Sequence, residues 1–437
     1  MKGYIILICL CLAWAYTLAQ TDCITIRGQV TSKDDKKAVG CARIHVLGQN
    51  IQTCANADGH YVLNLPAVGN RWQVVFSALG YQNDTLKASQ LMRQPNLRLT
   101  PGAVTLNEVK IVSRTPYSVL LEAVERIPDN YWTDTTTGTF FFRTYRMIND
   151  SIYLFYENMI ESLRVGYGRF NKKMFYLNPD RDGSRLLASD YKRILQSRML
   201  VYDTTFLVKM IADSSLFVNL LNLSEKDILY DNLEAPNASY LFSRRILKRK
   251  KYPLSMQEMT TADGEEYYLI GGSISKKHFS FVITVNKADF AVTDITLDLD
   301  SAYYVYPSDS SYQKEHPYAY QRRIKNRDEW HYRKVGGKYT LVSRTWEADY
   351  IDSCHNKYSW KSVPTMQRFK SFFVVQMVDF RSGDATFFDK GRILEPRRIN
   401  ISKLHNNSPE YDEEFWHGYN TVPLEDGIRT LLEQRLR

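Results

Sequence analysis

The chain lacks the sequence patterns of the common hydrolases. None of its eight histidines is followed three residues later by a glutamate, the spacing with which zinc carboxypeptidases bring two ligands to one metal. HExxH does not occur, and no serine stands in GxSxG, the turn that exposes the nucleophile of many hydrolases. No glycine-rich phosphate loop is present. We therefore expect no catalytic residue, no cofactor and no metal site, and we interpret the chain as non-enzymatic.

Cysteine is scarce: beyond the apolar start of the chain only Cys23, Cys41, Cys54 and Cys354 remain, and their spacings match no zinc pattern. Cys41 and Cys54 flank a predicted hairpin that turns near Gly48-Gln49-Asn50. In that register Cys54 faces Ile44, about 10 Å along the strand from Cys41. Bridged Cα atoms lie within about 7 Å. Cys41 and Cys54 are thus a disulfide candidate only if a bulge corrects the offset, and we expect thiols instead.

Long hydrophobic runs are absent except at the start. Lys2 precedes an apolar run from Ile5 to Ala15, and small residues follow up to Ala19. This pattern predicts that residues 1–19 are a signal peptide cleaved after Ala19. A membrane anchor is the alternative, but the run is short and no basic cluster follows it. A lipoprotein site at Cys23 fits badly, because the residues before it are not those of a lipobox.

No other stretch is long enough to cross a membrane as a helix, so we expect an exported protein of the periplasm or outer membrane that is not an integral membrane protein. The formal net charge of +9 favours a mildly basic solvated surface over an anionic lipid or glycan partner. For the basic run 244–251 we likewise favour a solvated surface over contact with an anionic lipid or glycan. No nucleic-acid-binding motif is present, and we expect no nucleic-acid partner.

Residues 20–114 read as short strands separated by turns, which predicts a small β-sandwich. Asp58-Gly59 marks one turn. Alternation places two sets of apolar side chains on single faces of their strands. These are Ala42, Ile44 and Val46 in the first set and Tyr61, Leu63 and Leu65 in the second.

The order of landmarks in this region is GQV, GCARIHVLG, NADGHYVLNLP, VVFSALGYQ, LRLTP and LNEVKIVSR. It resembles the carboxypeptidase-like regulatory domain, a transthyretin-like β-sandwich common at the front of exported proteins of Bacteroidetes. The resemblance implies a non-catalytic module at the start of a secreted chain. The later order of a helix, NYW, FFFRTYR and YLFYENMIES resembles exported proteins in which this domain precedes an uncharacterised β-rich region.

A linking helix is predicted over residues 115–135. Thr115 provides the N-cap and Pro116 the first helical position, while Pro128 is expected to end the helix. Apolar residues at helical spacing predict one packing face. They are Leu120, Ala123, Val124, Ile127 and Tyr131.

Residues 136–400 predict a larger curved antiparallel β domain with a helical insert near 185–224, so the fold class is mainly β with helical inserts. Asn149-Asp150, Lys287-Ala288-Asp289 and Gly336-Gly337 are expected at turns. Residues 401–437 are expected to anchor the C-terminus on the β body and to end in a helix. The anchoring aromatic residues would be Phe415, Trp416 and Tyr419, and the docking side chains Leu424, Ile428, Leu431 and Leu432.

The segment RDEWHYRK brings three titratable residues together. On a strand Glu329 and His331 share a face while Asp328 points to the other. Acid–base chemistry is one interpretation, but we favour a surface pair without a catalytic role.

These features together predict a non-enzymatic exported envelope protein with a binding or scaffolding role at the outer membrane, where a protein or a lipid would be the partner. One alternative is a periplasmic carrier that binds lipid or glycan on the concave face of the large sheet. The second alternative is an unrecognised hydrolase, which would require a cleft of converging polar groups.

Overall fold

The computed structural model describes residues 23–78, 80–101, 114–132, 136–164, 190–202, 253–261, 264–274, 279–299, 302–305, 321–354, 365–382 and 412–436. The chain divides into two compact units. The first contains residues up to Pro101 together with Glu414–Glu425, and the second contains Gly102–Glu413 and Asp426–Arg437. The predicted signal peptide lies outside the described residues. The fold is mainly β, as the sequence predicts.

The first unit is built from two small sheets. One has the order β4-β1-β7, formed by His60–Pro66, Cys23–Ser32 and Leu97–Leu99. The other has the order β3-β2-β5-β6, formed by Gln52–Cys54, Arg43–Val46, Gln73–Ser77 and Asp84–Lys87. Two short helical turns, η1 at Ala67–Arg71 and α2 at Ala88–Leu91, join the strands.

The core of the first unit confirms the predicted alternation. Both predicted sets of apolar side chains are buried in one hydrophobic cluster: Ala42, Ile44, Val46, Tyr61, Leu63 and Leu65. The predicted turn at Asp58-Gly59 is also present, since Gly59 has φ 78° and its carbonyl accepts a hydrogen bond from the Val30 amide at 2.8 Å. A Cβ on Gly59 would lie 2.4 Å from the Val30 carbonyl oxygen, so only glycine fits this turn without a shift.

The linking helix begins as predicted and ends earlier. α3 spans Pro116–Glu125, and the Thr115 side chain accepts a hydrogen bond from the Ser118 amide at 3.2 Å. A second short helix, α4, covers Ile127–Asn130. Pro128 therefore does not terminate the helix but lies in the first turn of α4, where the missing amide hydrogen costs nothing.

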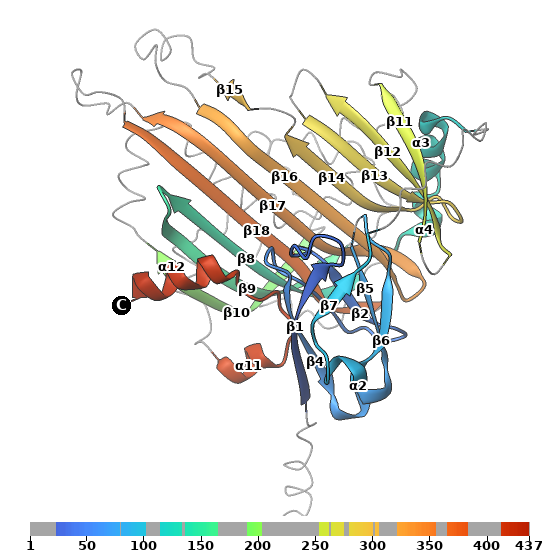
Figure 1. Ribbon diagram of the computed structural model, residues 1–437, viewed down its shortest axis with the longest axis horizontal. Helices are drawn as coiled ribbons and strands as arrows, with labels where there is room; N and C mark the ends of the chain where they lie inside the picture. Colours follow the sequence, from blue (N-terminus) through green and yellow to red (C-terminus); the bar gives the residue numbers. More distant parts are fainter. Residues whose placement is uncertain are drawn as a thin grey trace, which may run out of the picture. The chain divides into compact units, whose positions relative to one another are not determined.

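The larger unit contains an 11-stranded sheet with antiparallel pairing and a pronounced twist (Figure 1). Its main path runs β10-β9-β8-β18-β17-β16-β14-β13-β12-β11, and β15 pairs with β16. The first three strands are Thr136–Ile148 (β8), Ser151–Arg164 (β9) and Asp190–Tyr202 (β10). The middle five are Leu254–Thr260 (β11), Glu266–Ile274 (β12), Phe279–Asn286 (β13), Val292–Leu299 (β14) and Tyr303–Val305 (β15). The last three are Gln321–Val335 (β16), Lys338–Cys354 (β17) and Thr365–Ser382 (β18).

The predicted hairpin turns of this sheet are confirmed. Asn149 and Asp150 have φ values of 45° and 66° between β8 and β9, and Gly336 and Gly337 have 61° and 89° between β16 and β17. Positive φ at both central residues matches the twist of the flanking strands. A turn also covers residues 287–289.

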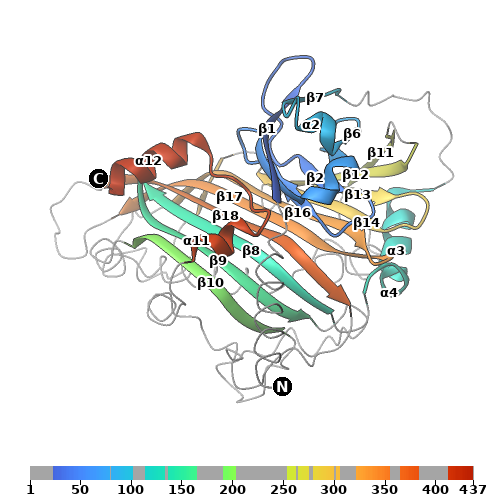
Figure 2. The same cartoon turned by 90° about the horizontal axis from the view of Figure 1, so that it is seen from below.

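α3 covers the β11–β14 end of the sheet, as both cartoon views show (Figures 1 and 2). Four of the five residues on the predicted helical face are buried: Leu120, Ala123, Ile127 and Tyr131. The Tyr131 hydroxyl also donates to the Val292 carbonyl at 2.5 Å. Because this face packs on the sheet, it is a structural contact and not a binding site.

The predicted helical insert near 185–224 is wrong where the structure describes it. Asp190–Tyr202 forms β10, which pairs antiparallel with β9 through two register shifts. The helix was predicted from the local spacing of apolar residues. The segment instead forms its backbone hydrogen bonds with β9, a partner that local spacing does not reveal. Residues 185–189 and 203–224 lie outside the described residues.

The C-terminal segment divides between the two units. Glu414–Glu425 joins the first unit, where the Asn56 side chain donates to the Leu424 carbonyl at 3.0 Å, whereas the residues from Asp426 on belong to the second unit, which contains the large sheet. The predicted final helix is present as α12, Asp426–Leu436, preceded by α11, Glu413–His417. Leu424 precedes α12, while Ile428 and Leu432 are buried, as expected of a docking helix.

Candidate functional site

One face of the large sheet carries a row of polar side chains. The row consists of successive cross-strand partners on β13, β14, β16, β17 and β18: Thr284, Asp294, His331, Ser343 and Gln376. Directly paired residues of antiparallel strands point to the same face. All five side chains of this polar row are buried. The face on which they lie is called the polar face below.

Beside the polar row, the opposite face of β13, β14 and β16 is apolar. Ile283, Ile295 and Trp330 alternate with members of the polar row and belong to the core that packs against α3. If the polar face of this sheet met only solvent, its polar side chains would be exposed. Here the polar row is itself buried, so polar groups are removed from water at a cost that requires hydrogen bonds to offset it.

Asp294 and His331 form the centre of the row. His331 Nδ1 lies 2.8 Å from Asp294 Oδ1, and the Thr293 hydroxyl donates to Asp294 Oδ2 at 2.7 Å. An ionised carboxylate only accepts hydrogen bonds, so Nδ1 of His331 carries the proton of this bond. Asp294 therefore fixes the orientation of the His331 ring.

Two atoms of the row are left without a hydrogen bond inside the described part of the chain. Nε2 of His331 and Oγ1 of Thr284 are both buried and meet no partner there. Thr284 is 3 % exposed and His331 is 7 % exposed. Buried polar atoms are usually satisfied in folded proteins, so these two atoms make the polar row a candidate functional site.

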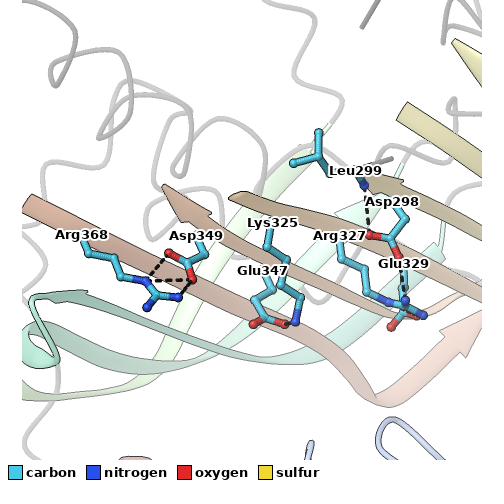
Figure 3. A network of polar contacts seen from close by, with 8 residues as sticks. All are labelled: Asp298, Leu299, Lys325, Arg327, Glu329, Glu347, Asp349 and Arg368. Atoms are coloured by element: carbon cyan, nitrogen blue, oxygen red, sulfur yellow. Dashed lines mark hydrogen bonds and ion pairs between the residues drawn. The ribbon is translucent and has the colours of Figure 1, made fainter. Parts of the chain in front are cut away.

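Farther along the polar face, charged side chains form an ionic ladder across β14, β16, β17 and β18 (Figure 3). Arg327 bridges Asp298 at 2.8 Å and Glu329 at 2.7 Å. Lys325 bonds Glu347 at 2.7 Å. The guanidinium of Arg368 donates hydrogen bonds to both carboxylate oxygens of Asp349. These seven residues are called the ionic ladder.

Most of the ladder is exposed to solvent, in contrast to the polar row, while the side chains of Glu329 and Asp349 are only 12 % exposed. The side chains of Lys325 and Glu347 are 45 % and 44 % exposed, and those of Arg327 and Asp298 are 41 % and 40 % exposed. Exposed pairs of this kind contribute little to stability, about 0–1 kcal/mol each. The polar face therefore has two parts on the same strands: the exposed, charged ionic ladder and the buried polar row.

Hydrogen bonds and charge shift two pKa values near the end of the ladder. The ammonium of Lys370 bonds Asp150 at 2.6 Å and holds the pKa of that carboxyl below its usual range. The hydrogen bond and charge of Asp349 raise the pKa of Arg368. Both shifts favour the ionised forms, so these pairs remain charged at neutral pH.

The β8–β9 part of the polar face holds a buried ion pair. Arg143 contacts Glu157 through Nε and a terminal nitrogen, each at 2.7 Å, and both side chains are less than a tenth exposed. Arg198 of β10 approaches the second carboxylate oxygen at 3.8 Å. Beside this pair, Tyr145 and Phe372 stack with ring centroids 4.9 Å apart, and both rings are half-buried.

The structure corrects the interpretation of RDEWHYRK. Glu329 and His331 do share the polar face, and Asp328 points to the other face, where it bonds Arg344 at 2.8 Å. His331, however, is buried rather than at the surface, and its partner is Asp294 instead of Glu329. The missed signal is the alternation in VTDITLDL, where Asp294, Thr296 and Asp298 mark a strand with one polar face.

The cysteine pair has a different register from the predicted one. Cys54 pairs with Arg43, two positions from Cys41, and not with Ile44. Cys41 itself precedes β2 with φ 57°. The structure holds Cys23, Cys41 and Cys54 as thiols. The basic run 244–251 lies outside the described residues. Within the described part of the chain, no three His, Cys, Asp or Glu side chains cluster as a metal site.

The sandwich fold of the first unit agrees with the sequence comparison. Residues 26–111 match the family model of the CarboxypepD_reg-like domain. This domain is the one that the sequence resembles, and the match ends before β8 begins. No curated protein matches the chain. In the part of the chain that the structure describes, no helix combines the length and apolarity needed to cross a membrane.

Proposed function

We propose that this chain is an exported, non-enzymatic envelope protein that binds or scaffolds another envelope component through the polar face of its large sheet. The observation that carries the proposal is the continuity of the buried polar row with the solvated ionic ladder on one face. Burying polar side chains does not by itself stabilise a fold, so a row of this kind is better explained by a ligand.

The histidine geometry supports a binding role over hydrolysis. A nucleophilic triad needs a hydroxyl or thiol within hydrogen-bond reach of the histidine nitrogen that the carboxylate leaves open. Nε2 of His331 meets no such group among the described residues. Among the described residues, the Asp294–His331 pair therefore has the acid and the base of a triad without a nucleophile beside them.

The location at the cell envelope rests on the predicted signal peptide and on the CarboxypepD_reg-like domain, which is non-catalytic. An outer-membrane protein or lipid is the expected partner of the polar face, and a periplasmic carrier of lipid or glycan is the alternative. The ladder is suited to either role, because paired charges can exchange their partners for those of a ligand with little loss of stability.

Charge reversal within the ladder tests this proposal. Arg327→Glu removes the cation that bridges Asp298 and Glu329, and the matched control Lys37→Glu breaks the exposed Lys37–Asp35 pair of the first unit. Formaldehyde crosslinking in the producing cells, followed by mass spectrometry, should recover an envelope component with the unmodified chain and the control. We expect the Arg327 variant to lose most of that capture. Equal capture by all three proteins would contradict the proposal.

A further inference from the structure

We propose that one end of the β-sandwich docks on the surface of an anionic lipid bilayer, where exposed apolar side chains enter the interface and basic side chains meet the headgroup phosphates. This end of the first unit is called the apolar end below. It consists of three segments, 47–50, 67–73 and 87–93, which include η1 and α2. The inference goes beyond the proposed function, because it concerns the first unit and not the polar face of the large sheet.

Backbone hydrogen bonds hold the three segments of the apolar end together. The Leu47 amide donates to the Gln73 carbonyl at 2.9 Å, and the Ala88 amide donates to the Trp72 carbonyl at 2.9 Å. Gln73 also pairs with Lys87 across β5 and β6. The end of β2, the beginning of β5 and the end of β6 therefore meet at one end of the sandwich, where η1 leads into β5 and α2 follows β6.

The exposed apolar side chains of the first unit gather at this end. Leu47 is 55 % exposed, Val68 76 % and Met92 50 %. Among the described residues of the first unit, these three are the exposed large hydrophobic side chains. Single exposed apolar residues are common on protein surfaces, whereas three on adjoining segments mark an interaction site.

The charge of the apolar end has one sign. Arg71, Lys87 and Arg93 are exposed, and the segments 47–50, 67–73 and 87–93 contain neither Asp nor Glu. Asp84 stands three positions before Lys87, but it begins β6 and thus lies at the other end of that strand. Each basic side chain near an anionic bilayer is attracted to its surface.

A bilayer surface matches both properties of the apolar end. Its interface takes up apolar side chains just below the headgroups, while the phosphates attract the surrounding cations. A second copy of this chain is a poorer match. In a twofold dimer the same surface meets itself, so three cations would face three cations across the interface.

Co-sedimentation of the mature chain, residues 20–437, with lipid vesicles tests the inference. Vesicles of equal parts phosphatidylglycerol and phosphatidylethanolamine are compared with vesicles of phosphatidylcholine at low salt. We expect saturable binding to the anionic vesicles only. Arg71→Glu/Arg93→Glu should weaken this binding at least about tenfold, since each reversal replaces an attraction by a repulsion. Val68→Asp should weaken it about tenfold, because a charge replaces an apolar side chain in the interface.

The matched controls are Lys33→Glu/Lys36→Glu and Met366→Asp. Cys23 at the start of β1 pairs with Pro66 directly before η1, so Lys33 and Lys36, which follow β1, lie at the opposite end of the sandwich. Both lysines are exposed. Met366 is 57 % exposed and belongs to the second unit. Both controls should bind the vesicles like the unmodified chain.

Several results would overturn the inference. They are an absence of binding to the anionic vesicles, equal weakening by the test and control variants, and binding that is lost in Arg327→Glu but not in Val68→Asp. A dimer in analytical ultracentrifugation that Val68→Asp abolishes would also overturn it and assign the apolar end to a second copy. The crosslinking that tests the proposed function does not involve the apolar end, so either proposal can fail without the other.

Discussion

The side-chain amide of Asn420 pairs with the backbone of Asn64 in both directions. Its oxygen accepts from the Asn64 amide, and its nitrogen donates to the Asn64 carbonyl at 3.1 Å. Asn64 lies in β4, which is an edge strand of its sheet within the described residues. One side chain from 356 positions away thus replaces a missing strand and satisfies an edge that would otherwise invite pairing with another chain.

Asn420→Ala should destabilise the first unit by about 1–2 kcal/mol, because it removes two hydrogen bonds to a partly buried backbone. Hydrogen exchange measured by mass spectrometry should show faster exchange in the peptide that contains β4. Peptides of the large sheet serve as the internal control and should be unchanged. Unaltered exchange in β4 would show that the C-terminal segment does not stabilise the sandwich.

Gly59→Ala should destabilise the sandwich more than Gly48→Ala does. Both glycines have positive φ, at 78° and 72°, so each substitution pays the conformational cost of about 1 kcal/mol. Only at Gly59 does the new Cβ also approach the Val30 carbonyl, since nothing lies within 4 Å of the same position at Gly48. Urea unfolding of the two variants measures the difference, and equal losses would refute the clash.

Arg143→Ala should cost about 3–5 kcal/mol, because Glu157 would remain as a buried charge beside the distant Arg198. The double variant Arg143→Met/Glu157→Leu removes both charges and should regain most of that loss. Thermal unfolding of the single and double variants measures both effects. A double variant as unstable as the single one would mean that the pair itself, and not the unpaired charge, determines stability.

The Asp150–Lys370 pair predicts a contribution to stability that disappears in acid. The folded pKa of Asp150 is lowered, so its stabilisation is fully present above the unfolded value of about 3.9 and is lost as the pH falls below it. Exposure to solvent keeps the effect below about 1 kcal/mol. Asp150→Asn should flatten the fall in unfolding free energy between pH 5 and pH 2, as measured in urea at low salt. An unchanged slope would contradict the shift.

Much of the fold could be predicted because its signals are local. The alternation of Tyr61, Leu63 and Leu65 and the turn at Asn149-Asp150 depend only on neighbouring residues, and both are confirmed. β10 was missed because its conformation depends on pairing with β9. Asp294 and His331 lie 37 positions apart, and only the register of β14 with β16 brings them together.

The C-terminal contact could not be read from the sequence for the same reason. Asn420 stands between aromatic and apolar residues that suggest a hydrophobic anchor, yet polar bonds to Asn64 and from Asn56 hold the segment. A single side-chain amide that bonds the edge of a strand produces no repeating pattern in the sequence. Its partner becomes evident only when the free edge of β4 is known.

The central claim, that the polar face is the binding surface, is tested most directly by site-specific photo-crosslinking in the producing cells. A photoreactive amino acid is placed at Lys325 on the ionic ladder and, as the control, at Lys37, whose side chain is 81 % exposed in the first unit. The account predicts that an envelope protein, lipid or glycan is captured from position 325 and not from position 37. The same products from both positions, or none from position 325, would contradict it.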